Sequence, residues 1–213
     1  DKDICLAISE QYLPVGMESQ IPKKPFSIAL SITDKIDTLV GFFGINEKPS
    51  SSKDPFALRR VALGVIRTIV ENKKDLKLND LLNFSIMLFQ DQGIKFSNNN
   101  VKQELNSFYK DRFKYYLKEK QIRPDIIEAS TKSFPINKLS SVFRKAKILN
   151  KIINTKIGHD LLSSFKRASN ILESEMKNNK VDIINTTDPG IFKTDFEKNL
   201  YKKINEIKKY YSQ

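Results

Sequence analysis

The chain has 213 residues, of which 39% are hydrophobic and 29% are charged, a composition typical of a folded protein rather than a disordered one. Its single cysteine, Cys5, excludes an internal disulfide and a cysteine-based zinc site, and it favours a reducing, cytoplasmic location. No apolar run approaches the roughly 18 residues that a membrane span needs, so no membrane partner is expected.

The net charge of +12 is unevenly distributed along the chain. Residues 1–100 carry 13 Lys or Arg and 12 Asp or Glu, whereas residues 101–213 carry 24 and 13, a net charge of +11. Such a surface attracts a polyanion, because each neutralised phosphate releases condensed counterions. Compositional drift toward lysine would raise the lysine content of both halves, yet the first half stays near neutral. The charge therefore favours nucleic-acid contact by the second half.

Apolar residues recur every three or four positions along most of the chain, which predicts an almost entirely helical structure. The clearest series begins at Ile28 and ends at Phe43. Eight prolines and seven glycines are too few for a turn-rich β fold. The predicted helices, in chain order, are 4–12, 25–44, 56–70, 78–90, 101–119, 124–130, 136–153, 159–176 and 195–211.

We therefore predict an all-α fold class with two helical bundles, comprising residues 1–94 and 95–213. The boundary follows the break at Asp91-Gln92-Gly93, where the charge balance also changes. Residues 56–70 are apolar on most of their circumference, which is typical of a central core helix. Asp54-Pro55 predicts its start, since Asp accepts from free amide groups and Pro fits the first turn.

Asp34 and Asp37 lie about one turn apart on one predicted helix. Paired carboxylates can bind a metal or share acid–base work, but no histidine or second acidic cluster lies nearby in the sequence. We therefore expect these carboxylates to form salt bridges with Arg59, Arg60 or Arg67 of the next helix, because buried charges are normally paired.

The only histidine belongs to the dipeptide His159-Asp160, which resembles the ligand pair of HD-type phosphohydrolases. It stands alone at a predicted helix start, where Asp160 complements the helix dipole. With one histidine, one cysteine and no Gly-rich phosphate loop, the residues for nucleophilic, zinc or P-loop catalysis are missing. We expect neither a catalytic residue nor a metal ligand.

Basic and aromatic residues alternate over 110–116 and 165–167, and such patches can contact phosphates and stack on unpaired bases. A solvated helix face without a partner is the alternative for both. The spacing predicts exposure of Lys110, Lys114, Tyr115, Lys118, Lys166 and Arg167. It predicts burial of Tyr109, Phe113, Tyr116, Leu161, Phe165, Ala168, Leu172, Phe196, Leu200, Ile204 and Ile207.

Residues 29–43 read ALSITDKIDTLVGFF and residues 52–64 read SKDPFALRRVALG. Together with Lys48-Pro49 and with EQYLP at 10–14, these runs resemble the β subunit of bacterial glycyl-tRNA synthetase. The run FKRASNIL at 165–172, with Asp111-Arg112, more loosely resembles the C-terminal anticodon-binding domain of that family. This domain is similar to the DALR type found in arginyl-tRNA synthetase.

The resemblance implies a tetramer of two α and two β subunits that joins glycine to its tRNA with ATP. The α subunit of that family carries the catalytic core, so ATP and glycine are expected there and no cofactor is expected in this chain. The β subunit handles much of the tRNA. Because the sequence begins at Asp1 without a methionine, we expect a fragment of a longer protein. The resemblance implies that it is a C-terminal fragment and that it is not catalytic by itself.

Under this resemblance, residues 1–94 correspond to the end of an HD-like domain and residues 95–213 to the DALR-like anticodon-binding domain. Asp34 resembles the last Asp of the HD pattern, whose His-Asp dyad would precede Asp1, so no metal is expected. Contacts with glycine tRNA are expected from Lys110, Arg112, Lys114, Lys166 and Arg167. The residues expected to stiffen the loop over residues 46–53, or to touch the tRNA elsewhere, are Lys53, Arg59 and Arg60.

Two other functions remain as alternatives. A helical protein-interaction module would dock onto the α subunit through its first half, without direct tRNA contact. A degenerate HD phosphohydrolase would bind metal and hydrolyse nucleotides. Binding to bare tRNA at moderate salt separates the first alternative from the tRNA-binding function.

Overall fold

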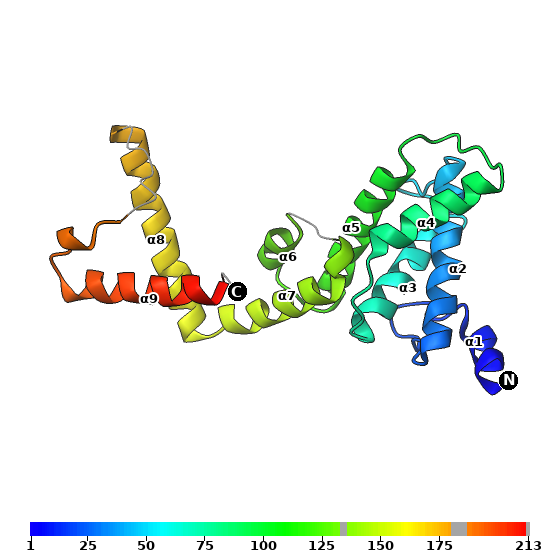
Figure 1. Cartoon of the computed structure of the whole chain (residues 1–213), viewed down its shortest axis with the longest axis horizontal. Coiled ribbons are helices and arrows are strands. Elements are labelled where there is room, and N and C mark those ends of the chain that lie inside the picture. The colour runs from blue at the N-terminus through cyan, green and yellow to red at the C-terminus, as the bar shows by residue number, and fades with distance from the viewer. Residues whose placement is uncertain (133–135, 180–186, 212–213) are drawn as a thin grey trace. The chain divides into compact units, whose positions relative to one another are not determined.

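The computed structural model describes residues 1–132, 136–179 and 187–211 (Figure 1). Over these residues the chain forms nine α-helices and two short 3₁₀ helices, with no β-strand, which confirms the all-α prediction. The elements are α1 (Lys2–Glu10), α2 (Pro25–Gly44), α3 (Leu58–Glu71), α4 (Leu78–Asp91), α5 (Val101–Glu119), α6 (Pro124–Thr131), η1 (Ile136–Lys138), α7 (Leu139–Ile153), α8 (Lys156–Asn179), η2 (Pro189–Ile191) and α9 (Asp195–Tyr211). None of the described helices combines the length and apolarity needed to cross a membrane.

The chain divides into two compact units, Asp1–His159 and Asp160–Gln213. In the first unit, α2 packs against α1, α3, α4 and α5, while α3 also contacts α5 and α7. The core of this unit draws on residues before and after position 94, including Leu39 and Tyr109. The domain boundary predicted between residues 94 and 95 stays a prediction.

Helix α3 lies at the centre of the first unit, as its apolar circumference predicts. Ala62, Val65 and Ile66 have no exposed surface, because neighbouring helices cover most sides of α3. The helix begins at Leu58 and not directly after Asp54-Pro55, because Ala57 adopts a left-handed conformation with φ of 53°. The Asp54 carboxylate nevertheless accepts hydrogen bonds from the amides of Leu58 (2.8 Å) and Arg59 (3.1 Å).

The second unit contains most of α8, with η2 and α9. Helix α9 begins with a capping box: Thr194 Oγ1 accepts from the Glu197 amide, and the Glu197 carboxylate accepts from the Thr194 amide. The apolar faces of both helices, predicted to point inward, are exposed: Phe165 is 68% exposed and Phe196 88%. A unit with two long helices offers too little surface to cover both faces. The other predicted inward residues that are exposed are Leu161, Ala168, Leu172, Leu200, Ile204 and Ile207.

Candidate nucleic-acid interface

Helix α5 carries the first predicted basic patch. Tyr109, Phe113 and Tyr116 are completely buried, as their spacing predicts, and they anchor the helix in the core. Tyr115 and Lys118 are exposed, as predicted, whereas Lys110 and Lys114 are only half-buried and therefore less accessible than predicted.

The basic residues of α5 do not share one face. Lys110 and Lys114 are four residues apart and lie on the same side, whereas Arg112 is about 200° around the helix from either. The Arg112 guanidinium carbon lies 5.9 Å from the centre of the Phe108 ring and 5.7 Å from that of Tyr115. Arg112 therefore packs between two aromatic rings on the opposite edge of the helix.

The two lysines of this patch differ in their partners. The half-buried Lys114 places its ammonium 2.7 Å from a carboxylate oxygen of Glu128 on α6. Lys110 forms no hydrogen bond or ion pair with any described residue. A cation without a carboxylate partner is free to meet a phosphate, so Lys110 is better suited to that role than Lys114.

Three further predicted residues lie on the loop before α3 and in the first turn of this helix: Lys53, Arg59 and Arg60. The Arg59 guanidinium donates to the Ser50 carbonyl and lies 3.8 Å from Asp54, so this arginine braces the loop. Lys53 and Arg60 are exposed, and their side chains have no polar partner among the described residues. Of these three side chains only that of Arg59 bonds the loop. Lys53 takes part through its backbone, whose amide donates to the Ser50 hydroxyl (3.1 Å) and whose carbonyl accepts from the Ser50 amide (2.9 Å).

Lys166 and Arg167 lie on α8 in the second unit. Both are exposed, as predicted, and neither side chain pairs with another described residue. The predicted contact residues thus lie on the loop before α3, in the first turn of α3, on two sides of α5 and on α8.

The salt bridges predicted for Asp34 and Asp37 do not form. Asp34 accepts a hydrogen bond from the Gln11 side chain at 2.8 Å, and Asp37 is exposed. Arg60 shares a pocket wall with Asp34 without an ion pair between them. Arg67 pairs instead with Glu71 on its own helix. Half-exposed carboxylates remain hydrated, so they do not require a cation.

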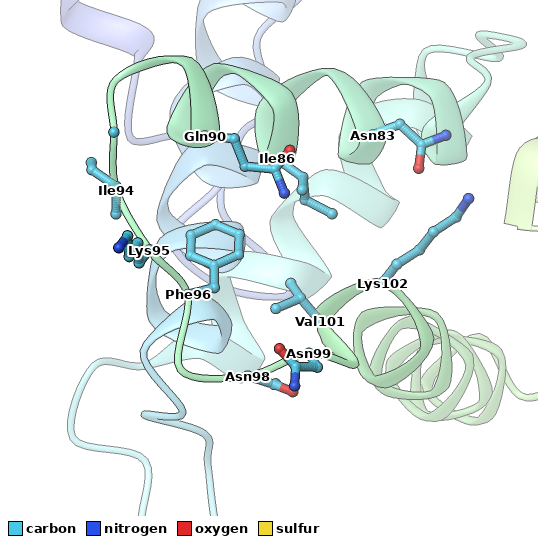
Figure 2. A pocket seen from close by; sticks show the side chains of 11 residues that line it. Asn83, Ile86, Gln90, Ile94, Lys95, Phe96, Asn98, Asn99, Val101 and Lys102 are labelled. Carbon is cyan, nitrogen blue, oxygen red and sulfur yellow. The ribbon is translucent and has the colours of Figure 1, made fainter.

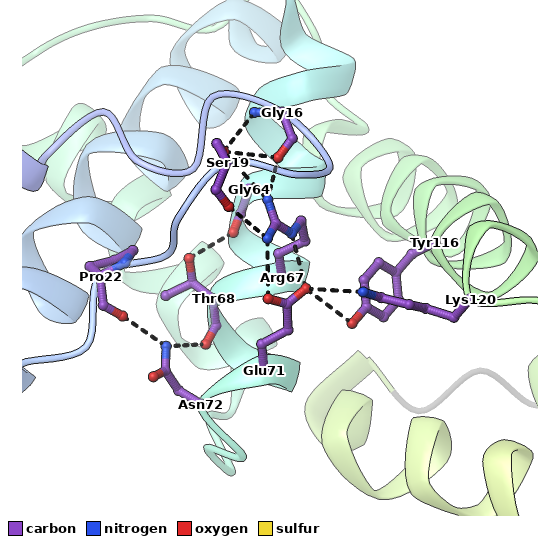
Figure 3. Close-up of polar contacts among 10 residues, drawn as sticks. All are labelled: Gly16, Ser19, Pro22, Gly64, Arg67, Thr68, Glu71, Asn72, Tyr116 and Lys120. Atoms are coloured by element: carbon purple, nitrogen blue, oxygen red, sulfur yellow. Dashed lines mark hydrogen bonds and ion pairs between the residues drawn. The ribbon is translucent and has the colours of Figure 1, made fainter.

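Arg67 and Glu71 form the centre of a polar network between α3, α5 and the segment after α1 (Figure 3). The nearly buried guanidinium donates to the carbonyls of Gly16 and Ser19 as well as to Glu71. Burial raises the pKa of Glu71, but hydrogen bonds and charge from Arg67 and Lys120 outweigh this effect and hold that pKa below its usual value. The network joins helices and serves the fold.

The buried ammonium of Lys35, on α2, was not anticipated. Its Nζ donates to the carbonyls of Gln11 (3.0 Å) and Leu13 (2.9 Å) and to the Ser31 hydroxyl (2.9 Å). Burial lowers its pKa to about 8, with Asp34 opposing the shift. A Cβ placed on Gly64 would lie 2.9 Å from Lys35 Cε, so a glycine is needed there for the lysine to pass.

No group of three or more His, Cys, Asp or Glu side chains able to hold a metal occurs within residues 1–132, 136–179 and 187–211. His159 and Asp160 are both exposed.

Comparison with known proteins identifies relatives for most of the chain. A family model described as the glycyl-tRNA synthetase beta subunit matches residues 1–132. The glycine–tRNA ligase beta subunit of Rickettsia canadensis is 37% identical over 210 residues, covering 97% of this chain and 29% of the relative. The proteins of the same name from Cereibacter sphaeroides and Rhodospirillum centenum are 36% and 39% identical over 198 and 179 residues. They are covered over 28% and 24% of their length, and this chain over 93% and 84%. The chain thus spans less than a third of these curated relatives.

Proposed function

The chain belongs to the glycyl-tRNA synthetase beta subunit family, and on this basis we propose that it is a tRNA-binding part of a glycine–tRNA ligase. The observation that carries the proposal is the net charge of +11 on residues 101–213, together with the exposed, unpaired Lys166 and Arg167 among the described residues. Exposed cations without carboxylate partners gain most from meeting phosphates, because they lose no existing ion pair.

The proposal also covers the partners, the location and the domains of the chain. Its partners would be glycine tRNA and the α subunit, which would hold ATP and glycine, and the complex would act in the cytoplasm. Residues 1–94 would be the end of an HD-like domain and residues 95–213 a DALR-like anticodon-binding domain. The proposed tRNA contacts include the unpaired cations Lys110, Lys53 and Arg60. Lys114 and Arg59 have a smaller role in these contacts because each already meets a carboxylate.

A salt titration of glycine tRNA binding by the complete protein tests this function. The double variant Lys166→Gln/Arg167→Gln should reduce the slope of log affinity against log salt by about 2, because two phosphate contacts are lost. The matched control is Lys114→Gln/Arg59→Gln. It removes the same charge from groups that already meet Glu128 and Asp54, so it should change the slope less. Equal slopes in the wild type and in both variants would contradict the proposal.

One observation favours a form of the protein-interaction alternative in which docking uses the second half of the chain and not the first: the apolar side chains of α8 and α9, such as Phe165 and Phe196, are exposed. Exposed apolar surface of this kind is typical of protein contacts. Under this alternative, Phe165→Ser would weaken co-purification of the α subunit while tRNA affinity and its salt slope stay unchanged. The tRNA-binding function predicts instead that Lys166→Gln/Arg167→Gln lowers tRNA affinity and its salt slope, while co-purification of the α subunit stays unchanged.

A further inference from the structure

A pocket of about 730 Å³ opens between α4, the loop over residues 92–100 and the start of α5 (Figure 2). Its volume lies in the range of sites that hold small ligands. The pocket belongs entirely to the first unit, and none of the residues predicted to contact tRNA lines it.

One wall of the pocket is apolar and consists of Ile86, Phe96 and Val101. The Phe96 ring is held from behind: its centre lies 5.5 Å from that of Phe89, and a Cβ on Gly44 would lie 2.5 Å from Phe96 Cδ1. Figure 2 shows Ile86 extending from α4 toward Phe96 and Val101. A fixed aromatic ring with aliphatic neighbours suits a flat ligand face.

The pocket also offers carboxamides with unused hydrogen-bonding groups. Asn83, Gln90 and Asn99 are exposed, and their side chains have no polar partner among the described residues. Each carboxamide presents a donor beside an acceptor, the same combination that base edges present. Asn98 differs, because its side chain already bonds the Phe43 carbonyl, Glu104 and the Asn100 amide.

Two lysines give the pocket a positive charge, and no carboxylate is among its lining residues. Lys95 and Lys102 are exposed and form no ion pair within the described part of the chain. Figure 2 shows them on opposite sides of Phe96, Lys95 on the loop and Lys102 on α5. Two separated cations suit a ligand with an anionic group on each side of a flat apolar centre.

We propose that this pocket binds one unpaired nucleotide of an RNA strand. The base lies against Phe96, its edge meets the carboxamides of Asn83 and Gln90, and its two flanking phosphates meet Lys95 and Lys102. A free mononucleotide shares this chemistry but has one phosphate, so the opposed lysines favour a nucleotide within a strand. The inference rests on the proposed tRNA-binding function and gives that function a second, base-contacting site.

Chemical probing of glycine tRNA bound to the complete protein tests the proposal base by base. In the wild-type complex, the edge of one unpaired base should be protected. Asn83→Ala/Gln90→Ala should lose protection at that base only and lower affinity about tenfold, within the range of a base contact. Phe96→Leu keeps an apolar side chain but removes the stacking face, so it should expose the same base.

A matched pair of lysine variants separates the pocket from general attraction to phosphate. Lys77, an exposed lysine immediately before α4, does not line the pocket. Lys77→Gln should leave the base protected, whereas Lys102→Gln, with the same loss of charge, should expose it. A footprint unchanged by every pocket variant, with tRNA still bound, overturns this inference and leaves the proposed function standing. Absence of tRNA binding by the wild type overturns the proposed function itself.

A second measurement distinguishes the two sources of a nucleotide. Titration of the same protein with AMP, GMP, CMP and UMP should give weaker binding than titration with single-stranded trinucleotides, whose central base has a phosphate on each side. Lys95→Gln and Lys102→Gln should each weaken the trinucleotide complex. Equal affinity for a mononucleotide and the corresponding trinucleotide overturns the assignment to an RNA strand.

Discussion

Glu71 accepts two hydrogen bonds from Arg67, at 3.0 Å from Nε and 3.1 Å from Nη2, and thereby fixes the guanidinium one helical turn before it on α3. The same guanidinium bonds the carbonyls of Gly16 and Ser19, which lie in the segment after α1. One ion pair within α3 thus holds the N-terminal segment against the core.

Glu71→Gln should lower the free energy of unfolding by about 2 kcal/mol at neutral pH, less than for a fully buried pair because Glu71 is partly solvated. The folded-state pKa of Glu71 is below its ordinary value of 4.5, so its contribution is present above that value and is lost as pH falls through the folded-state pKa. Urea unfolding at neutral and acidic pH measures the difference, which should shrink in acid. A constant difference would show that the charge of Glu71 does not matter.

Lys35 should make stability rise with alkaline pH. Its pKa is about 8 in the folded protein, against an ordinary 10.5, so between these values the unfolded chain binds more protons. The free energy of unfolding of the wild type, relative to Lys35→Met, should therefore increase on the order of 2 kcal/mol across this window. Urea titrations at several pH values test this. A pH-independent difference between the two proteins contradicts it.

Asn98→Ala should destabilise the first unit by about 2 kcal/mol, because the nearly buried Asn98 side chain joins the end of α2 to the start of α5. The Phe43 carbonyl would lose this donor. Asn99→Ala is the matched control, since the neighbouring amide is exposed and has no partner among the described residues. Thermal unfolding of both variants should show a loss for Asn98→Ala only.

Arg112→Lys should separate packing from phosphate contact at a residue predicted to touch tRNA. The substitution keeps the charge but loses the planar group between the Phe108 and Tyr115 rings, so stability should fall by about 1 kcal/mol. Arg112→Gln also removes the charge, and in this second variant the salt slope of tRNA binding should remain unchanged. A reduced slope with unaltered stability would instead assign Arg112 to the RNA.

Apolar spacing predicts the helices closely: the ranges predicted for α2, α5 and α9 match the observed bounds. It also predicts the burial of Tyr109, Phe113 and Tyr116, because several neighbours cover that face of α5. The same pattern fails for Phe165 on α8. Periodicity shows which face of a helix is apolar, but it does not show whether another element covers that face.

The spacing of apolar residues does not predict polar contacts between segments that are distant in the sequence. Lys35 is buried because the chain around Gln11 and Leu13 returns to α2, and nothing near Lys35 in the sequence indicates this. The partner of Arg67 likewise depended on where the Gly16 and Ser19 carbonyls lie. The nucleotide pocket combines α4, a loop and α5, so its residues share no single helical period.

The close approach of Lys35 Cε and Cδ to Gly64 has a consequence for sequence variation. A larger residue at position 64 needs a shorter side chain at position 35, so substitutions at the two sites should be epistatic. Gly64→Ala should be harmful beside Lys35 and much milder in a Lys35→Ala background, although the Pro14 carbonyl, 3.3 Å from the added carbon, keeps some of the cost. Among related chains, the two positions should therefore change together, with glycine at 64 wherever a lysine crosses the helix interface.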